Sequence, residues 1–244
     1  MDELRRSFHH DLQKARDELA LMVAKVAEVI PRATSVLLDS DLQAAEAVIA
    51  GDAEIDALAV EVEEHCIQIL ALQAPVAGDL RQVLALLKMI AEVERSADLA
   101  ANVCKAARRI YGHDLDPRVR GVIARMGEQA QAIFDAALEA FRESDSAKAA
   151  ALDDMDAYLD ALQKQFISAI FESQAQGHID LQVAVQLAMV ARFFERIGDH
   201  AVNMGERVLY ITTGKVPDHK KPKRAKVVLG DDLQPIGEEG DTTP

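Results

Sequence analysis

The sequence contains an internal repeat that spans most of its 244 residues. Ile55-Asp56-Ala57-Leu58 returns as Leu159-Asp160-Ala161-Leu162, 104 positions later. Farther along, Glu94-Arg95-x-x-Asp98-x-x-x-Asn102 returns as Glu195-Arg196-x-x-Asp199-x-x-x-Asn203, 101 positions later. Self-similarity at this scale predicts two copies of one structural unit. The change of offset places a three-residue length difference in one loop.

Each copy has the pattern of helix almost throughout, because Ala, Leu, Glu, Gln, Lys and Arg dominate and apolar residues recur every three or four positions. Proline and glycine mark the breaks. The predicted helices are about 3–38, 53–73, 76–111, 117–143, 154–175 and 179–213, and short helical pieces at about 41–51 and 145–152 precede the second helix of each copy. The predicted fold is therefore all-α, with two homologous three-helix bundles in tandem over residues 1–112 and 113–214. Residues 215–244 have no apolar period and are expected to form a disordered charged tail.

Charge and cysteine content exclude several classes of function. With 27 Lys and Arg against 41 Asp and Glu, the net charge is −14, which repels phosphate backbones and argues against nucleic acid as a partner. Two cysteines are too few for a disulfide scaffold and fit buried thiols in a reducing compartment. The charged N-terminus and the lack of a long apolar stretch predict a cytoplasmic protein without a signal peptide or membrane span.

The repeated acidic motif predicts an oxygen-rich ridge on one helix of each copy. Residues at i, i+4 and i+8 advance about 40° per step around a helix and about 6 Å along it. Glu94, Asp98 and Asn102 therefore follow one another along a single face. The same spacing recurs in Glu195, Asp199 and Asn203.

The preceding helix of each copy is expected to bring further carboxylates to the same height. If the first hairpin turns near Pro75, antiparallel pairing sets residue n level with about 151 − n, so Asp98 lies level with residue 53. Asp52 and Asp56 stand there. In the second copy the turn lies near residues 176–177, and the matching carboxylates are Asp156 and Asp160.

Carboxylate and amide oxygens are ligands for hard cations, so these residues are candidate metal ligands. The alternative is that each ridge is a solvated acidic face neighboured by Arg95 or Arg196. No Glu-x-x-His pair, phosphate-binding glycine loop or nucleophile with a base is visible, which argues against an enzyme. Two alternatives stay open, a metal-dependent phosphate-ester hydrolase and a structural helical scaffold without metal.

Two longer stretches strengthen the interpretation. FERIGDHAVNMGERVLYITTG (194–214) and LALQAPVAGDLR (70–81), together with the repeated motif, resemble the PhoU family of regulators of phosphate-specific transport. The resemblance implies metal clusters, most often of iron, with Mg, Mn, Zn or Ca as alternatives. They would lie at Glu94/Asp98 and Glu195/Asp199, and Asn102 and Asn203 match the same extended motif.

The resemblance also implies a function. PhoU-like proteins are negative regulators that link the ATPase subunit of the phosphate ABC transporter to a sensor histidine kinase, and they contact the membrane only through these partners. We also expect a homodimer, the commonest oligomer. The first copy departs from the family pattern, because Ser96-Ala97 stands where the second copy has Ile197-Gly198. The added Cβ predicts that the second site is more fully occupied than the first.

Overall fold

The computed structural model describes residues 2–215, which form six helices and, within that range, no strand. The helices are α1 (Asp2–Asp39), α2 (Leu42–Gln73), α3 (Ala77–Arg109), α4 (Pro117–Glu143), α5 (Ser146–Ala175) and α6 (Leu181–Thr213). The predicted all-α fold with tandem bundles is confirmed. The predicted charged tail from residue 216 onward lies outside the described residues.

The prediction of separate short pieces before the second helix of each copy is wrong. Residues 41–51 and 145–152 are the first turns of α2 and α5, which each run without a break. Asp41 caps α2 by accepting hydrogen bonds from the backbone N–H groups of residues 43 and 44. Gly51 costs α2 about 1 kcal/mol relative to alanine, which the packing of a 32-residue helix outweighs.

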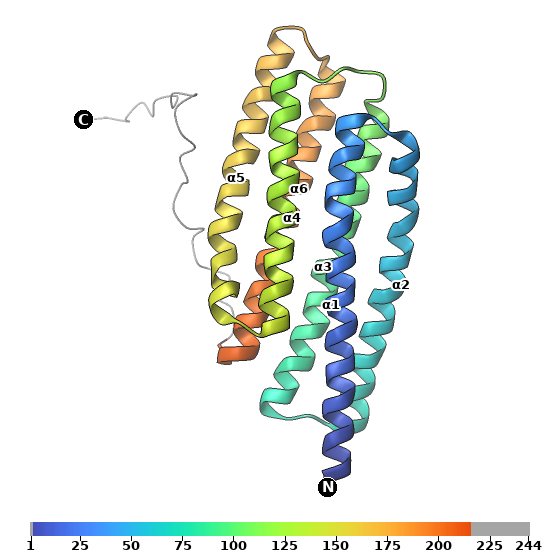
Figure 1. Ribbon diagram of the computed structural model, residues 1–244, viewed down its shortest axis with the longest axis vertical. Helices are drawn as coiled ribbons and strands as arrows, with labels where there is room; N and C mark the ends of the chain where they lie inside the picture. Colours follow the sequence, from blue (N-terminus) through green and yellow to red (C-terminus); the bar gives the residue numbers. More distant parts are fainter. Residues whose placement is uncertain (1, 216–244) are drawn as a thin grey trace, which may run out of the picture.

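All six helices run roughly along the long axis of the molecule (Figure 1). The two bundles run in opposite directions, so that α3 lies antiparallel to α6 and α1 antiparallel to α4. These four helices form the middle of the molecule. The outer helices, α2 and α5, lie on opposite sides, with α2 packed on α1 and α3, and α5 packed on α4 and α6.

One hydrophobic core runs through both bundles. Its largest fully buried side chains include four phenylalanines, all of them in the second copy: Phe134, Phe141, Phe166 and Phe194. Burying each such ring contributes about 1.5–3 kcal/mol. The division of the chain into units at residues 112 and 113 stays a prediction.

The bundles meet closely where α1 crosses α4. A Cβ built on Gly127 would lie 2.3 Å from the Oγ1 atom of Thr34, so only glycine fits opposite that side chain. The Thr34 hydroxyl is buried and donates to the carbonyl of Ile30 at 3.0 Å. The crossing therefore has no room for a larger residue at position 127.

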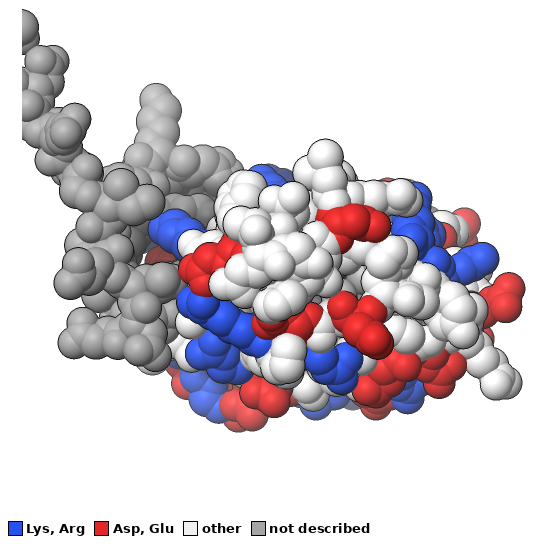
Figure 2. All heavy atoms as spheres, turned by 90° about the horizontal axis from the view of Figure 1, so that it is seen from above, with Lys and Arg blue, Asp and Glu red and all other residues white. Residues whose placement is uncertain are grey.

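The described part of the chain exposes a mixed charged surface. Figure 2 looks onto one end of the bundle and shows Lys, Arg, Asp and Glu side chains mainly around its margin, with uncharged side chains in the middle. Among residues 2–215, no helix combines the length and apolar content that a bilayer span requires.

Candidate functional site

The first carboxylate site lies between α2 and α3. The Asp52 side chain on α2 hydrogen-bonds to that of Asp98 on α3, and Asp56, one turn farther along α2, is close enough to act on Asp52 by its charge. Burial, followed by the charges of Asp98 and Asp56, raises the pKa of Asp52 to about 6. These three carboxyl groups thus repel one another when all are ionised.

Two polar side chains of α3 border this site. The Lys105 ammonium donates to the Oδ1 atom of Asn102 at 3.2 Å. Its charge also acts to lower the pKa of Asp52, against the larger effects of burial and of the neighbouring carboxylates. Glu94 is half-buried one turn from Asp98. The local excess of negative charge is therefore only partly compensated by the chain.

The second site lies between α5 and α6 and is more deeply buried. Asp156 and Glu195 are exposed by only 7% and 8%, while Asp160 and Asp199 are half-buried. Glu195 forms an ion pair with Arg192. Burying carboxylates in this way is costly unless a cation or hydrogen-bond donors compensate the charge.

Gly198 explains why the second site is the tighter of the two. A Cβ at this position would lie 2.5 Å from Oδ1 of Asp156 and 2.7 Å from Cδ2 of Leu159, so the missing side chain lets Asp156 reach the α6 backbone. The equivalent residue in α3 is Ala97, which carries a Cβ at the corresponding point. The difference between Ser96-Ala97 and Ile197-Gly198 thus has a direct structural counterpart.

The structure places Asp52 on α2 near Asp98 on α3, with Asp56 close enough to act on Asp52 by its charge, and it places Asp156 on α5 against Gly198, next to Asp199 in the sequence. Whether any of these residues binds metal is untested and remains a prediction.

Asn203 lies differently from its place in the motif. Its Nδ2 atom donates to Oε2 of Glu92 at 3.0 Å, so the side chain faces α3. Each step of four residues turns by about 40° around the helix, so the two steps from Glu195 to Asn203 turn the side chain of Asn203 away from α5. In this arrangement Asn203 supports the contact between the bundles.

The sequence reasoning missed Glu92 altogether. Its Oε2 atom also lies 2.6 Å from Nδ1 of His200, which is 7% exposed, so a glutamate and a histidine from different bundles pair in the interior. The position of Glu92 in the repeat could have revealed it. Glu92 stands where the second copy has Phe193, on the stripe of α3 that faces the other bundle, and a charge there requires a buried partner.

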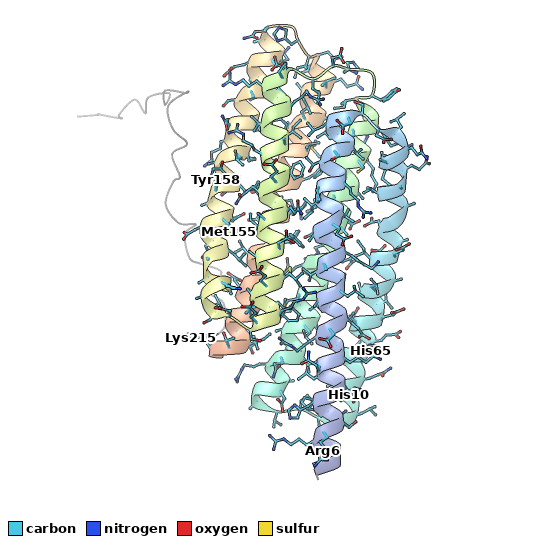
Figure 3. All side chains as sticks on the ribbon, viewed as in Figure 1. Arg6, His10, His65, Met155, Tyr158 and Lys215 are labelled. Carbon is cyan, nitrogen blue, oxygen red and sulfur yellow. The ribbon has the colours of Figure 1, made fainter. Side chains whose placement is uncertain are left out.

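The remaining histidines contribute little to these sites. His65 pairs through Nδ1 with Oε2 of Glu18 at 2.6 Å. In Figure 3, His65 and His10 lie in the lower half of the first bundle, whereas Met155 and Tyr158, which flank Asp156 in the sequence, lie nearer mid-length of the second bundle. The two histidines are therefore not part of either carboxylate site.

The donor set fits a hard cation in its chemistry, since both sites offer carboxylate oxygens from two adjacent helices. Among residues 2–215, however, no three His, Cys, Asp or Glu side chains are already grouped as they would be around a metal ion. Binding would therefore require local rotation, including separation of the hydrogen-bonded Asp52 and Asp98.

The fold and the two acidic sites define a class of protein, a tandem pair of three-helix bundles that repeats one carboxylate motif in each half. The PhoU domain model matches residues 19–107 and again 123–208. The chain belongs to the PhoU family.

Relatives and solved structures agree with this assignment. The chain is 35% identical over 215 residues to a Mycobacterium tuberculosis protein named phosphate-specific transport system accessory protein PhoU homolog 1, covering 88% of this chain and 96% of that protein. It is 34% identical to PhoU homolog 2 of the same organism, over 88% of this chain and all of that one. The crystal structure of PhoU from Pseudomonas aeruginosa superposes with a TM-score of 0.80 at 28% identity, over 85% of this chain and 100% of that one.

Proposed function

We propose that this protein is a metal-binding negative regulator of phosphate uptake and of phosphate-starvation signalling. It would act in the cytoplasm as an adaptor between the ATPase subunit of a phosphate ABC transporter and a sensor histidine kinase. The names of the relatives, which are accessory proteins of phosphate-specific transport systems, support the transport role. Metal binding, contact with these two partners and action in the cytoplasm are parts of the proposal that those names do not state.

The observation that carries the proposal is the duplicated acidic site. In the first half Asp52 of α2 lies near Asp98 of α3, and in the second half Asp156 of α5 lies against Gly198 of α6, next to Asp199 in the sequence. In the first site the raised pKa of Asp52, caused by burial and then by Asp98 and Asp56, indicates a charge imbalance that a bound cation would relieve.

The residues that would hold the cation are Asp52, Asp56, Glu94 and Asp98 in the first site and Asp156, Asp160, Glu195 and Asp199 in the second. A hard cation there would join two helices through their carboxylates, and in the first site it would relieve the repulsion of Asp52 by Asp98 and Asp56. The chain's own part is to hold the oxygens on long, packed helices, so that the outer face of each bundle keeps one shape for a partner. Its long helices suit an adaptor.

Partner binding by purified proteins tests this function. The ATPase subunit and the cytoplasmic part of the kinase, both from the source organism, would be titrated onto immobilised protein that is either loaded with Fe, Mn or Mg or treated with EDTA. Both partners are expected to bind the loaded protein and to bind Asp98→Asn/Asp199→Asn at least about tenfold more weakly. Asp114→Asn, in the exposed loop before α4, is the matched control.

Failure of both partners to bind the loaded protein would overturn the adaptor role. Equal binding by the loaded protein, the EDTA-treated protein and Asp98→Asn/Asp199→Asn would keep the adaptor and overturn the part given to metal. Light scattering of the same samples tests the proposed homodimer, with twice the 26.6 kDa chain mass expected.

A further inference from the structure

A ridge of exposed side chains on α6 has no partner within the described part of the molecule. Leu181, Val185 and Met189 are exposed by 70%, 51% and 48%. Their spacing of four residues puts them on one face of the helix. Arg192 and Arg196 continue the same stripe and are also exposed, so the ridge covers about 22 Å of helix.

The neighbouring helix adds a further cation to this surface. Arg109, in the last turn of α3, donates from Nη1 to Oε1 of Gln186 at 3.4 Å, which places its guanidinium against the α6 residue that follows Val185. Among the described carboxylates, one ion-pairs with a ridge arginine, Glu195 with Arg192. Arg109 and Arg196 have no such pair within residues 2–215. We call the following six residues the α6 ridge: Leu181, Val185, Met189, Arg192, Arg196 and Arg109.

The ridge is not a feature that the fold imposes on both halves. The equivalent positions in the first copy, 101 residues earlier, are Leu80, Leu84 and Lys88. Leu80 is half-buried and Leu84 is 38% exposed, so the continuous apolar stretch is missing there. A surface that one copy has and its homologue lacks is not explained by the packing that both share.

We propose that the α6 ridge is a docking site for an acidic amphipathic helix of a partner protein. A stripe at i, i+4 and i+8 is the ridge that packs into the groove of another helix. The apolar half of the ridge would bury the partner's apolar face, while Arg109 and Arg196 would meet its carboxylates. In a chain of net charge −14, a local cationic strip selects an acidic partner over a basic one.

The borders of the ridge favour a helix over an anionic membrane. Asp180, whose side chain is 57% exposed, lies directly before Leu181, and Asp199 follows Arg196 about one turn farther along α6. A flat anionic bilayer pressed onto this face would meet both carboxylates. A single helix lying along α6 would contact the ridge between them.

A designed peptide tests the site without knowledge of the natural partner. The probe is a fluorescein-labelled helix of about 20 residues, with leucine at positions three and four apart and glutamate elsewhere, and the reference peptide carries glutamine in place of glutamate. Fluorescence anisotropy is measured with the full chain. We expect saturable binding of the acidic peptide that weakens between about 0.1 M and 1 M salt, as the Debye length falls from about 10 Å to about 3 Å.

Variants of the ridge separate its two components. Arg109→Glu/Arg196→Glu is expected to weaken binding at least about tenfold, and Val185→Ser/Met189→Ser at least about threefold. Arg142→Glu/Lys164→Glu changes the net charge equally at exposed positions elsewhere and is expected to bind like the unchanged protein. Thermal melts check that each variant is folded.

Three outcomes would overturn the proposal: no saturable binding of the acidic peptide, equal loss in the control variant, or equal binding of the glutamine peptide. A fourth arm uses vesicles of equal parts phosphatidylglycerol and phosphatidylcholine. Vesicle binding that is lost in Arg109→Glu/Arg196→Glu, without peptide binding, would assign the ridge to a membrane instead. Of the ridge residues, Arg192 ion-pairs with the proposed ligand Glu195, whereas the residues that the variants change are not proposed ligands, so EDTA-treated protein is expected to bind the peptide equally well.

Discussion

The Nδ1 atom of His200 on α6 lies 2.6 Å from Oε2 of Glu92 on α3, in the interior contact between the two bundles. Because a carboxylate only accepts, Nδ1 carries the proton. Burial alone would raise the pKa of Glu92, but hydrogen bonds from His200 and Asn203 outweigh it and hold that pKa below its ordinary value. This polar contact fixes how the two copies meet, since it forms in one relative position of α3 and α6.

The pairing predicts an unusual double-mutant result. Glu92→Phe or His200→Leu alone leaves a buried polar partner and is expected to cost about 1–3 kcal/mol of the free energy of unfolding. Phe193 and Leu99 occupy the equivalent positions on the other side of the repeat. The double variant therefore copies the apolar pair and is expected to recover most of the loss. Additive losses in chemical denaturation would contradict the role given to this pair.

The first carboxylate site predicts a pH-dependent effect of Asp52→Asn. The pKa of Asp52 is raised to about 6 by burial and by Asp98 and Asp56, above its value of about 3.9 in an unfolded chain. A raised folded pKa means that stability is fully present below the unfolded pKa and is lost as pH rises through about 6. In EDTA-treated protein, Asp52→Asn is expected to raise Tm at about pH 8 but not at about pH 4.

Glu128→Gln, exposed on α4, is the control and is expected to leave both melting temperatures unchanged. In metal-loaded protein the sign reverses, because Asp52→Asn then removes a ligand. An equal Tm gain at both pH values would show that the carboxylates do not repel one another as the structure implies.

The close approach of α5 to α6 predicts opposite effects for two glycine substitutions. Gly198→Ala forces a Cβ to within 2.5 Å of Asp156 and is expected to destabilise the protein by about 1–3 kcal/mol. Gly121→Ala, in an exposed part of α4 with nothing within 4 Å, is expected to stabilise it by about 1 kcal/mol. Equal effects on urea unfolding would refute the tight packing at Gly198.

The two cysteines predict a reactivity pattern. Burial raises the pKa of both Cys66 and Cys104 to about 12, and both thiols are free. Neither is expected to react with a disulfide reagent at about pH 8 in the native protein, while both react in urea. Since the folded pKa is raised, this contribution to stability is lost as pH rises from about 9 toward about 12. Rapid native labelling would contradict the burial.

Much of the fold could be predicted from the repeat and the helical period, because helices predicted in one copy can be compared with the equivalent segments of the other. The proximity of Asp52 to Asp98 followed from counting residues back from the turn at Pro75. Asp41 and Asp145 are the N-caps of α2 and α5, and the sequence offered both as capping residues. Because they were not recognised as the starts of long helices, separate short pieces were predicted there.

The contacts between the bundles could not be reached in this way. Counting levels within a hairpin needs a short turn, whereas the register of α3 on α6 is set by side chains about 100 positions apart, such as Glu92 and His200. The direction of Asn203 depended on the same register. The α6 ridge could not be predicted, because the apolar pattern of α6 does not show which apolar side chains are exposed. Val183 and Val185 lie two residues apart, yet they are 1% and 51% exposed.

Elemental analysis of the purified protein, alongside Asp52→Asn/Asp98→Asn and Asp156→Asn/Asp199→Asn, measures whether the two acidic sites bind metal. We expect bound iron or another hard cation in the unchanged protein, with a separate share lost in each double variant and the larger share lost from the second site. Protein that stays free of metal after incubation with Fe, Mn, Mg, Zn and Ca would contradict this expectation. The acidic faces would then be solvated surfaces of a helical scaffold.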